Sequence, residues 1–254
     1  MKRVLSVLTL LCLLATVAFA QQYKKAFSSS GAKRVQIVIE NSELSITGSS
    51  GNEVVINTSD GDFEMPERAK GLRPLYRDAS DNTGIGLEVT ESGNTITIKK
   101  ASGKEGDYRI QIPTDASIKI EEVGWQSDDF SISGVKGEIE IQSTGSDIQL
   151  ENVTGPIVAN STSGDITVVF SQLSQEGPTS ISNTSGFIDG TMPANAKANL
   201  ELSSISGDIY TDMDLKSSDG MKQVGGSSIK AAINGGGVEV SLRTISDDIY
   251  LRKK

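Results

Sequence analysis

The sequence predicts an all-β protein whose chain coils into a β-solenoid of about 20 residues per rung. Three observations predict this fold: a short motif that recurs at a nearly constant spacing, apolar residues that alternate with polar ones, and Ser, Gly, Asp and Asn gathered between these segments. Alternation with a period of two is typical of strands with one buried face. Because one such repeat is too small to bury its own apolar face, neighbouring repeats must stack to share a core.

The recurring motif is a polar corner followed by an apolar residue. Its copies are Ser127–Phe130, Gly145–Ile148, Ser163–Ile166, Ser185–Ile188, Ser206–Ile209 and Ser246–Ile249. The first five copies follow one another at nearly even intervals, and the interval before the sixth is close to two periods. We therefore expect Ile148, Ile166, Ile188 and Ile209 to stack as an interior ladder. The corner residues would supply positive φ angles and hydrogen bonds from side chain to backbone.

A second strand-like segment lies between the motif copies, as in 137–141, 155–159 and 198–202. Each period therefore carries two strands and two turns. Residues 125–254 form the regular rungs, and residues 21–124 show the same pattern less regularly, so we expect one continuous domain. The stretch at about 60–86 breaks the pattern and is predicted to be an inserted loop.

The segment 1–20 has the pattern of a secretory signal peptide. Lys2 and Arg3 precede an apolar run from Val4 to Val17, and Ala18–Ala20 form a small-x-small cleavage signal. The apolar run is shorter than the roughly 20 residues that a bilayer span needs. We expect an exported protein of the periplasm or cell surface that begins at Gln21 and keeps no transmembrane segment after cleavage.

Composition excludes several kinds of chemistry. The chain has no histidine, and its one cysteine, Cys12, lies inside the signal segment, so the mature chain has no thiolate nucleophile, disulfide or imidazole metal ligand. Removal of Lys2 and Arg3 leaves 22 basic residues against 33 acidic ones, a net charge of −11. This charge argues against nucleic acid as a partner. We predict no catalytic residue and no cofactor.

The Ser-Gly-Asp-Ile turns, the leader peptide and the stretch from Asp81 to Leu87 together resemble a bacterial family of β-strand-repeat adhesins labelled domain of unknown function 4097. The resemblance covers nearly all of the mature chain. It implies a single-stranded right-handed parallel β-helix outside the cytoplasm, in an adhesin-type protein of the cell envelope. The family has no established catalytic residues, so the resemblance assigns no site.

Five aspartates occupy one position of the repeat: Asp129, Asp147, Asp165, Asp208 and Asp248. Stacked rungs would place them in a column at a spacing of about 4.8 Å. Such a column could supply calcium ligands, since calcium prefers carboxylate oxygens. Each aspartate could instead cap its own corner by accepting backbone N–H groups. Because Phe187 interrupts the column, we predict corner capping and no metal site.

The predicted loop carries a basic cluster, Arg68, Lys70, Arg73 and Arg77, together with Tyr76. On an acidic protein this cluster could bind an anionic sugar or lipid headgroup. It could equally be a solvated loop face whose Leu72 and Leu75 cover the solenoid. Two further aromatic residues, Tyr108 and Trp125, could stack on sugar rings or fill the seam between the two halves.

These observations favour a non-enzymatic scaffold that binds another envelope or surface component, with a glycan as one candidate. A second hypothesis is a polysaccharide lyase or hydrolase. It is weakened because adjacent carboxylates such as Asp247 and Asp248 would point to opposite faces of a strand. A third hypothesis is a calcium-stabilised envelope protein.

Overall fold

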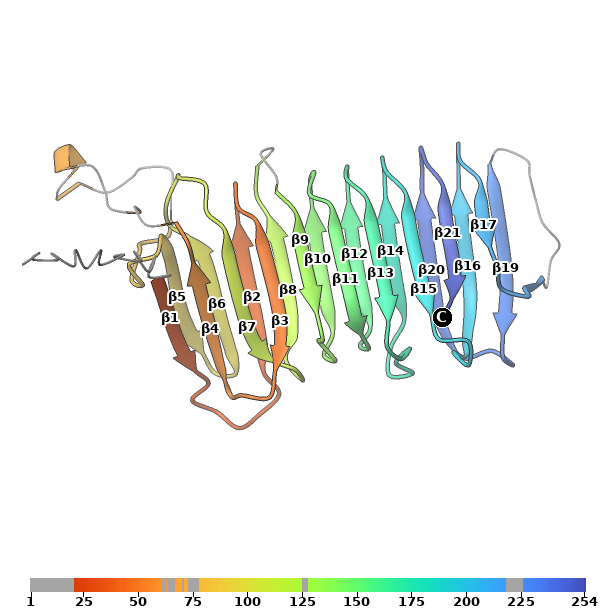
Figure 1. The fold of residues 1–254 in the computed structure, drawn as a ribbon, viewed down its shortest axis with the longest axis horizontal. Helices are drawn as coiled ribbons and strands as arrows, with labels where there is room; N and C mark the ends of the chain where they lie inside the picture. Colours follow the sequence, from red (N-terminus) through yellow and green to blue (C-terminus); the bar gives the residue numbers. More distant parts are fainter. Residues whose placement is uncertain are drawn as a thin grey trace, which may run out of the picture.

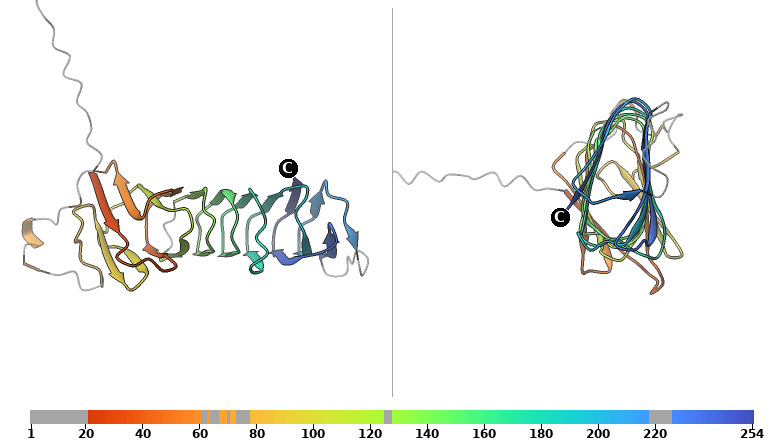
Figure 2. Two further views of the ribbon diagram at one scale, coloured as in Figure 1. Left: turned by 90° about the horizontal axis from the view of Figure 1, so that it is seen from below. Right: turned by 90° about the vertical axis from the view of Figure 1, so that its right-hand side faces the viewer.

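Two long β-sheets face each other along the length of a rod-shaped molecule, with the strands running across the rod (Figures 1 and 2). The computed structural model describes residues 21–60, 63, 67–69, 71–72, 78–124, 128–217 and 226–254. The predicted signal peptide lies outside these residues. Within them, the one helical segment is the short 3-10 turn η1, Glu67–Ala69. The predicted all-β, solenoid-like architecture is thus confirmed.

Sheet A has ten strands, which in spatial order are β1 (Gln21–Ala26), β4 (Glu53–Thr58), β7 (Tyr108–Pro113), β3 (Leu44–Ser49), β9 (Phe130–Ser133), β11 (Ile148–Val153), β13 (Ile166–Phe170), β15 (Ile188–Met192), β21 (Ile249–Lys253) and β17 (Ile209–Thr211). Sheet B has eleven, in the order β5 (Leu87–Ser92), β6 (Thr95–Lys100), β2 (Arg34–Ile39), β8 (Ser117–Glu122), β10 (Ile139–Ser143), β12 (Ile157–Ser161), β14 (Thr179–Asn183), β20 (Val238–Thr244), β16 (Ala198–Ser204), β19 (Ser227–Ile233) and β18 (Lys216–Ser217). In the middle of the rod, each rung contributes one strand to each sheet.

The middle of the rod is a regular parallel stack. From β8 and β9 to β14 and β15, the rungs follow one another in chain order, and neighbouring strands in each sheet run parallel. Ile148 pairs with Ile166, and Ile166 pairs with Ile188. All three side chains are fully buried, which confirms this part of the predicted ladder.

At both ends of the rod, the spatial order of the strands differs from their order in the chain. The rung of β20 and β21 lies between that of β14 and β15 and that of β16 and β17. Consequently Ile249, not Ile209, pairs with Ile188, and Ile209 follows Ile249 as the last member of the column. At the other end the rung of β2 and β3 is inserted between β6 and β7 on one side and β8 and β9 on the other. The four isoleucines expected in the ladder therefore share one column, but Ile249 lies between Ile188 and Ile209, and Ile209 is only partly buried.

The two ends also contain antiparallel strands, which a purely parallel coil lacks. β4 pairs antiparallel with both β1 and β7, and β5 pairs antiparallel with β6. At the far end β19 pairs antiparallel with β16 and with β18. Of these pairs, β5 and β6 are joined by a two-residue turn, Gly93 and Asn94, as adjacent antiparallel strands can be.

The space between the sheets is filled by columns of apolar side chains that run along the rod. One column consists of Tyr108, Leu44, Phe130, Ile148, Ile166, Ile188, Ile249 and Ile209 in successive register. Its counterpart in sheet B consists of Ile98, Ile37, Ile120, Ile141, Ala159, Ile181, Leu242, Leu202 and Ile229. All of these side chains except Ile209 are buried. Like residues on like strands thus build one continuous core.

A buried polar column lies inside the corner that joins sheet B to sheet A. Its members are Glu122, Ser143, Ser161, Asn183, Thr244 and Ser204. The Glu122 carboxylate accepts hydrogen bonds from the hydroxyls of Ser143 (2.6 Å) and Ser146 (2.8 Å) and from the Thr144 N–H (2.6 Å). Asn183 donates to the Gly164 carbonyl (2.7 Å). The column satisfies backbone groups at corners too tight for regular pairing.

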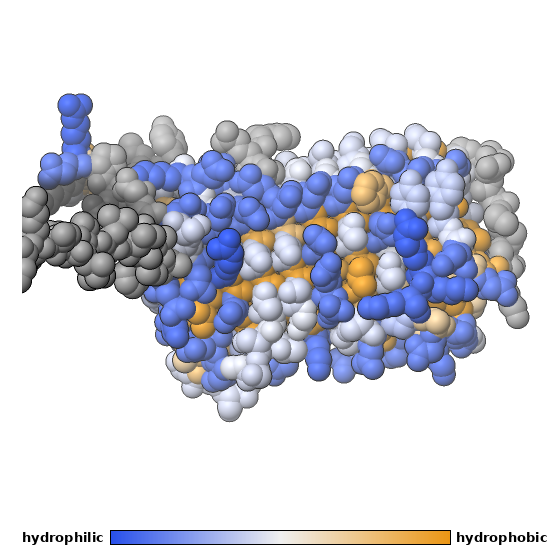
Figure 3. Space-filling view, in the orientation of Figure 1, coloured by the Kyte–Doolittle hydropathy of each residue, from blue (hydrophilic) through white to orange (hydrophobic). Residues whose placement is uncertain are grey.

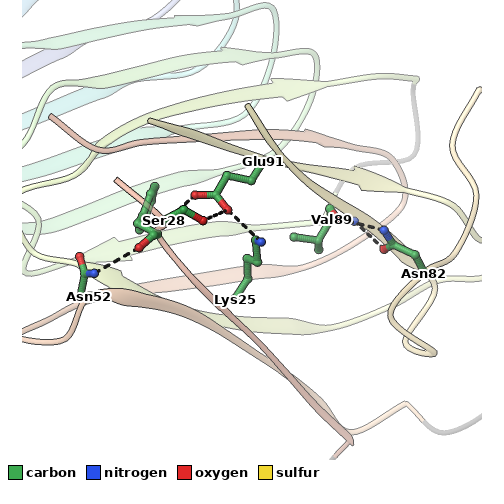
Figure 4. A network of polar contacts seen from close by, with 7 residues as sticks. Lys25, Ser28, Asn52, Asn82, Val89 and Glu91 are labelled. Atoms are coloured by element: carbon green, nitrogen blue, oxygen red, sulfur yellow. Dashed lines mark hydrogen bonds and ion pairs between the residues drawn. The ribbon is translucent and has the colours of Figure 1, made fainter. Parts of the chain in front are cut away.

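A polar network fastens the first strand to the opposite sheet. Figure 4 shows Glu91 of β5 bonded to Lys25 of β1 (2.8 Å) and, through both carboxylate oxygens, to the backbone N–H (2.7 Å) and hydroxyl (2.9 Å) of Ser28. Nearby, the Asn82 amide exchanges two hydrogen bonds with the backbone of Val89. The lysine–glutamate bond holds the pKa of Glu91 at about 2.

The described part of the chain contains no helix with the length and hydropathy of a membrane span.

Candidate ligand-binding surface

The five aspartates of the repeat lie at one corner of the coil, each directly before a strand of sheet A. Asp147 accepts the backbone N–H of Asp165 (2.7 Å), Asp165 accepts that of Phe187 (3.1 Å), and Asp248 accepts that of Asp208 (2.8 Å). The carboxylates thus cap the corner of the neighbouring rung, whereas the sequence predicted that each caps its own. Each of these three bonds ties two rungs together.

Phe187 replaces an aspartate in this column, and the structure shows how the break is repaired. The Asp248 N–H faces the rung of Phe187, where it meets no carboxylate. It donates instead to the side chain of Asp247, its own neighbour in sequence (2.8 Å). Asp247 thus supplies from within the same rung the acceptor that Phe187 lacks.

The column has no grouping of metal ligands among the described residues, where no cluster of three or more His, Cys, Asp or Glu side chains could hold an ion. Burial raises the pKa of the Asp165 carboxyl, and the charges of Asp147 and Asp247 raise it further, against the hydrogen bond from Phe187. The prediction that the protein binds no metal stays a prediction.

Two tyrosines stand beside this column on the outer face of sheet A. Tyr210 of β17 and Tyr250 of β21 occupy paired positions on adjacent parallel strands. Their rings stack with centroids 5.3 Å apart and planes 12° apart. Phe187 meets Tyr250 edge to face, with centroids 6.0 Å apart. The result is an aromatic row across three rungs, at whose end Tyr210 is 49% exposed.

The aspartates hold the tyrosine hydroxyls. Tyr250 donates to Asp248 (3.0 Å) and Tyr210 to Asp208 (3.5 Å). The hydrogen bond to Asp248 raises the pKa of Tyr250, and the charges of Asp208 and Asp248 raise the pKa of Tyr210. We call Phe187, Tyr210, Tyr250, Asp208 and Asp248 the tyrosine surface.

An arginine buttresses this surface on the same face. Arg252 forms a two-pronged ion pair with Asp189, with its Nε 3.0 Å and one Nη 2.9 Å from the carboxylate. Its guanidinium lies 5.5 Å from the centroid of the Tyr250 ring, within the range of a cation–π contact. The pair restrains Arg252, which in turn packs against the middle ring of the row.

The tyrosine surface was not among the predicted sites, although the sequence contains a signal for it. Asp-Ile-Tyr occurs twice, at 208–210 and 248–250, at the same position of the repeat. In a strand the residue after a buried isoleucine points outward, so both tyrosines must lie on the outer face. Their adjacency could not be predicted, because it depends on β21 lying directly beside β17.

Most of the other candidate residues lie outside the described part of the chain. Arg68 lies exposed in η1, whereas Lys70, Arg73, Tyr76 and Arg77 lie outside the described residues. Trp125 also lies outside them.

Tyr108 is buried, so it cannot act as a sugar platform. Its hydroxyl donates to the Ile85 carbonyl (2.9 Å) and accepts from the buried Lys100 ammonium (3.3 Å). Burial raises the pKa of Tyr108. It stacks on Phe63 with centroids 6.1 Å apart. Tyr108 therefore belongs to the core of the irregular half.

The outer surface is polar along its rims. Figure 3 shows hydrophilic side chains over most of one face, with a band of hydrophobic residues running between them along the rod.

Solved structures that resemble the chain include a candidate cell adhesion protein of Clostridium sporogenes (12% identity over 92% of this chain and 100% of that one, TM-score 0.41). They also include a candidate adhesin of Bacteroides fragilis (11%, 92% and 97%, TM-score 0.35). A third is a candidate lipid-binding protein of Parabacteroides distasonis (12%, 93% and 98%, TM-score 0.38). These identities and TM-scores are too low to carry an argument about function.

A search of curated proteins found no match. A family model described as Toastrack DUF4097 matches residues 87–252, which is more than half of the chain and includes the regular rungs and the tyrosine surface. The chain belongs to the Toastrack DUF4097 family.

Proposed function

We propose that the protein is an exported, non-enzymatic cell-envelope scaffold of adhesin type, which binds another envelope or surface component through the tyrosine surface. The observation that carries the proposal is the exposed ring of Tyr210 at the end of the aromatic row. Tyrosine is enriched at binding sites because it combines a large apolar face with a hydrogen-bonding tip.

The surface is preorganised for binding. Tyr250 is fixed by Asp248 and Arg252, and its strand lies between two neighbours in sheet A. Binding here costs little side-chain conformational entropy, because the side chains are already ordered, and this favours affinity. Asp208 adds an acceptor beside the exposed ring for a donor on the ligand.

Export is part of the proposal and rests on the signal-peptide pattern of residues 1–20. Cleavage after Ala20 would leave β1 and its bond between Lys25 and Glu91 intact. Location in the periplasm or at the cell surface follows from such cleavage. Amino-terminal sequencing of the protein recovered from envelope and culture fractions should read Gln21 first, and a start at Met1 would contradict export by this route.

The right-handed sense of the coil also belongs to the proposal. Parallel strands of one sheet joined through a crossover are right-handed in about 98% of cases, because of strand twist.

The basic loop residues Arg68, Lys70, Arg73 and Arg77, with Tyr76, form a second proposed contact, for an anionic headgroup or sugar. Reversal of these charges should weaken binding to anionic vesicles. Unchanged binding would remove the loop from the proposal.

The tyrosine surface can be tested with labelled mature protein on isolated bacterial envelope fragments. Tyr210→Ala should raise the half-saturating concentration about tenfold or more, since truncation of an aromatic anchor often has this effect. Val123→Ala, which shortens another exposed apolar side chain far from this surface, is the matched control. Equal binding by wild type and Tyr210→Ala would contradict the proposal.

Two alternatives have their own tests. Incubation of the protein with any glycan it retains should leave that glycan intact, and the appearance of products would overturn the non-enzymatic assignment. We propose that the aspartate column stabilises corners and does not bind calcium. The melting temperature should therefore be the same with calcium as with chelator, and a calcium-dependent rise would restore the calcium hypothesis.

A further inference from the structure

A shallow groove runs along the rod on the other side of the aspartate corner, over the outer face of sheet B. Its volume is about 630 Å³. Its lining consists mainly of amide and hydroxyl side chains, with Arg243 as the one charged residue and Ile205 and Ile245 at one edge. The lining residues come from five neighbouring strands of sheet B, β10, β12, β14, β20 and β16, and from the corners that follow β12, β14, β20 and β16.

The floor of the groove is an in-register column. Gln142 pairs with Asn160, Asn160 with Ser182, Ser182 with Arg243, and Arg243 with Ser203. Each rung therefore presents one outward polar side chain at the same height. Neighbouring rungs are about 4.8 Å apart, so the column repeats its hydrogen-bonding groups at that interval over about 19 Å.

The groove differs in charge from the rest of the protein. None of its lining residues is acidic, although the chain carries a net charge of −9. Its one charged residue, Arg243, forms an ion pair with Glu201 (3.0 Å). The groove is thus lined by amides and hydroxyls whose hydrogen bonds require no charge on the ligand.

We propose that this groove binds an extended chain of neutral sugars along the rod, with one sugar residue over each rung. The rung spacing is close to the advance of one pyranose in an extended glycan, so successive sugars can meet equivalent side chains. Amides and hydroxyls match sugar hydroxyls. The exposed side chains of Ile205 and Ile245 supply an apolar edge for the C–H faces of the rings.

The same features disfavour other extended ligands. An extended peptide advances about 3.3 Å per residue, which does not keep step with rungs about 4.8 Å apart. An acidic glycan would need cations along the whole groove, and the lining offers Arg243 alone. The inference rests on the proposed function in one respect, that the protein binds a surface component, and it uses a surface separate from the tyrosine surface.

The test is calorimetric titration of the mature protein with β-1,4-linked oligomers of glucose and of N-acetylglucosamine, from the dimer to the octamer. Affinity should rise with length up to the pentamer, which matches the strands that line the groove, and then level off. The double variant Gln142→Ala/Asn160→Ala should weaken pentamer binding about tenfold, since it removes two hydrogen-bonding side chains. Gln149→Ala is the matched control, because Gln149 is the outward glutamine of the same rung in sheet A.

Three results would overturn the inference: no binding of any oligomer, binding that the double variant leaves unchanged, or tighter binding of an oligogalacturonate of equal length. If Tyr210→Ala abolishes pentamer binding and the groove variant does not, the ligand lies on the tyrosine surface. That outcome would support the proposed function and contradict the groove. If both variants fold as wild type by circular dichroism and the groove variant alone loses binding, the inference stands.

Discussion

The middle and the ends of this solenoid are built from the same strands by different rules. Between β8 and β15, each rung stacks on the one before it in sequence, and all neighbours run parallel. At the ends, later or earlier rungs are inserted out of order and antiparallel strands close the stack. The middle is therefore stabilised by the repeated parallel pairing of equivalent strands, whereas the ends depend on inserted rungs and antiparallel pairs.

Binding surfaces can arise where rungs are inserted out of chain order. In the middle, the outward positions of sheet A beside the core column carry Ser131, Gln149 and Thr167. At the far end, insertion of β21 beside β17 brings together two tyrosines that lie far apart in the sequence. A surface that depends on such an insertion should be lost when the insertion is disturbed.

Deletion of the last strand should have the largest effect. Removal of 249–254 takes β21 out of the interior of sheet A and leaves β15 and β17 without their shared neighbour. We expect the far end of the rod to lose its cooperative unfolding transition in urea, because a gap inside a stack breaks the continuous core. Removal of 253–254 alone is the control. A nearly unchanged transition after the longer deletion would mean that β21 is dispensable.

Single truncations in the isoleucine column should show how much each rung contributes to stability. Ile166→Ala and Ile249→Ala should each cost about 2–5 kcal/mol of unfolding free energy, since both side chains are fully buried. Ile209→Ala should cost less, because Ile209 is only partly buried at the edge of the sheet. Urea denaturation measures all three. If Ile249→Ala proved milder than Ile209→Ala, the stack would follow chain order after all.

The network around Glu91 should make the first end sensitive to acid. The bond with Lys25 lowers the pKa of Glu91 from 4.5 to about 2, so its contribution is complete above pH 4.5 and is lost as the pH falls toward 2. Hydrogen exchange of peptides from β1, corrected for intrinsic rates, should show loss of protection across this range. Glu91→Gln should flatten the profile, whereas Glu105→Gln at an exposed site should preserve it.

The smallest effect concerns the tyrosine pair. Because Asp248 accepts the Tyr250 hydroxyl, Tyr250 should ionise above the ordinary pKa of 10, and stability should fall as the pH rises beyond that value. The phenolate absorbance of wild type minus that of Tyr250→Phe isolates this group. Asp248→Asn should move the midpoint toward 10, and an unchanged midpoint would show that the hydrogen bond is not formed.

The sequence predicted the fold where chain order equals spatial order. Strand alternation and the corner motif identified Ile148, Ile166 and Ile188 as neighbours because each repeat can be counted from the last. The order of Ile209 and Ile249 could not be predicted by counting repeats, because an interval of nearly two periods does not say on which side of a rung the next one inserts. The segment between those two isoleucines holds β18 and β19, which pair antiparallel, and β20, which returns to lie parallel between β14 and β16.

The candidate sites were less predictable than the fold for the same reason. The aspartate column was visible in the sequence, but the rung that each carboxylate caps depends on how the corners lie against one another. The polar groove could not be predicted, because the pairing of Ser182 with Arg243 joins rungs from distant parts of the chain. Residues that the repeat brings together could be inferred, and residues that the insertion brings together could not.

The most direct test of the inserted rung is disulfide formation, for which the mature chain is suited because its one cysteine lies in the predicted signal segment. Asp189 pairs with Tyr250, and two paired positions on adjacent strands can be bridged. Asp189 and Tyr210 are separated by two rung spacings, about 10 Å, which is too far. The double variant Asp189→Cys/Tyr250→Cys should therefore form an intramolecular disulfide on mild oxidation, and Asp189→Cys/Tyr210→Cys should not. The opposite pattern would contradict the insertion and with it the tyrosine surface.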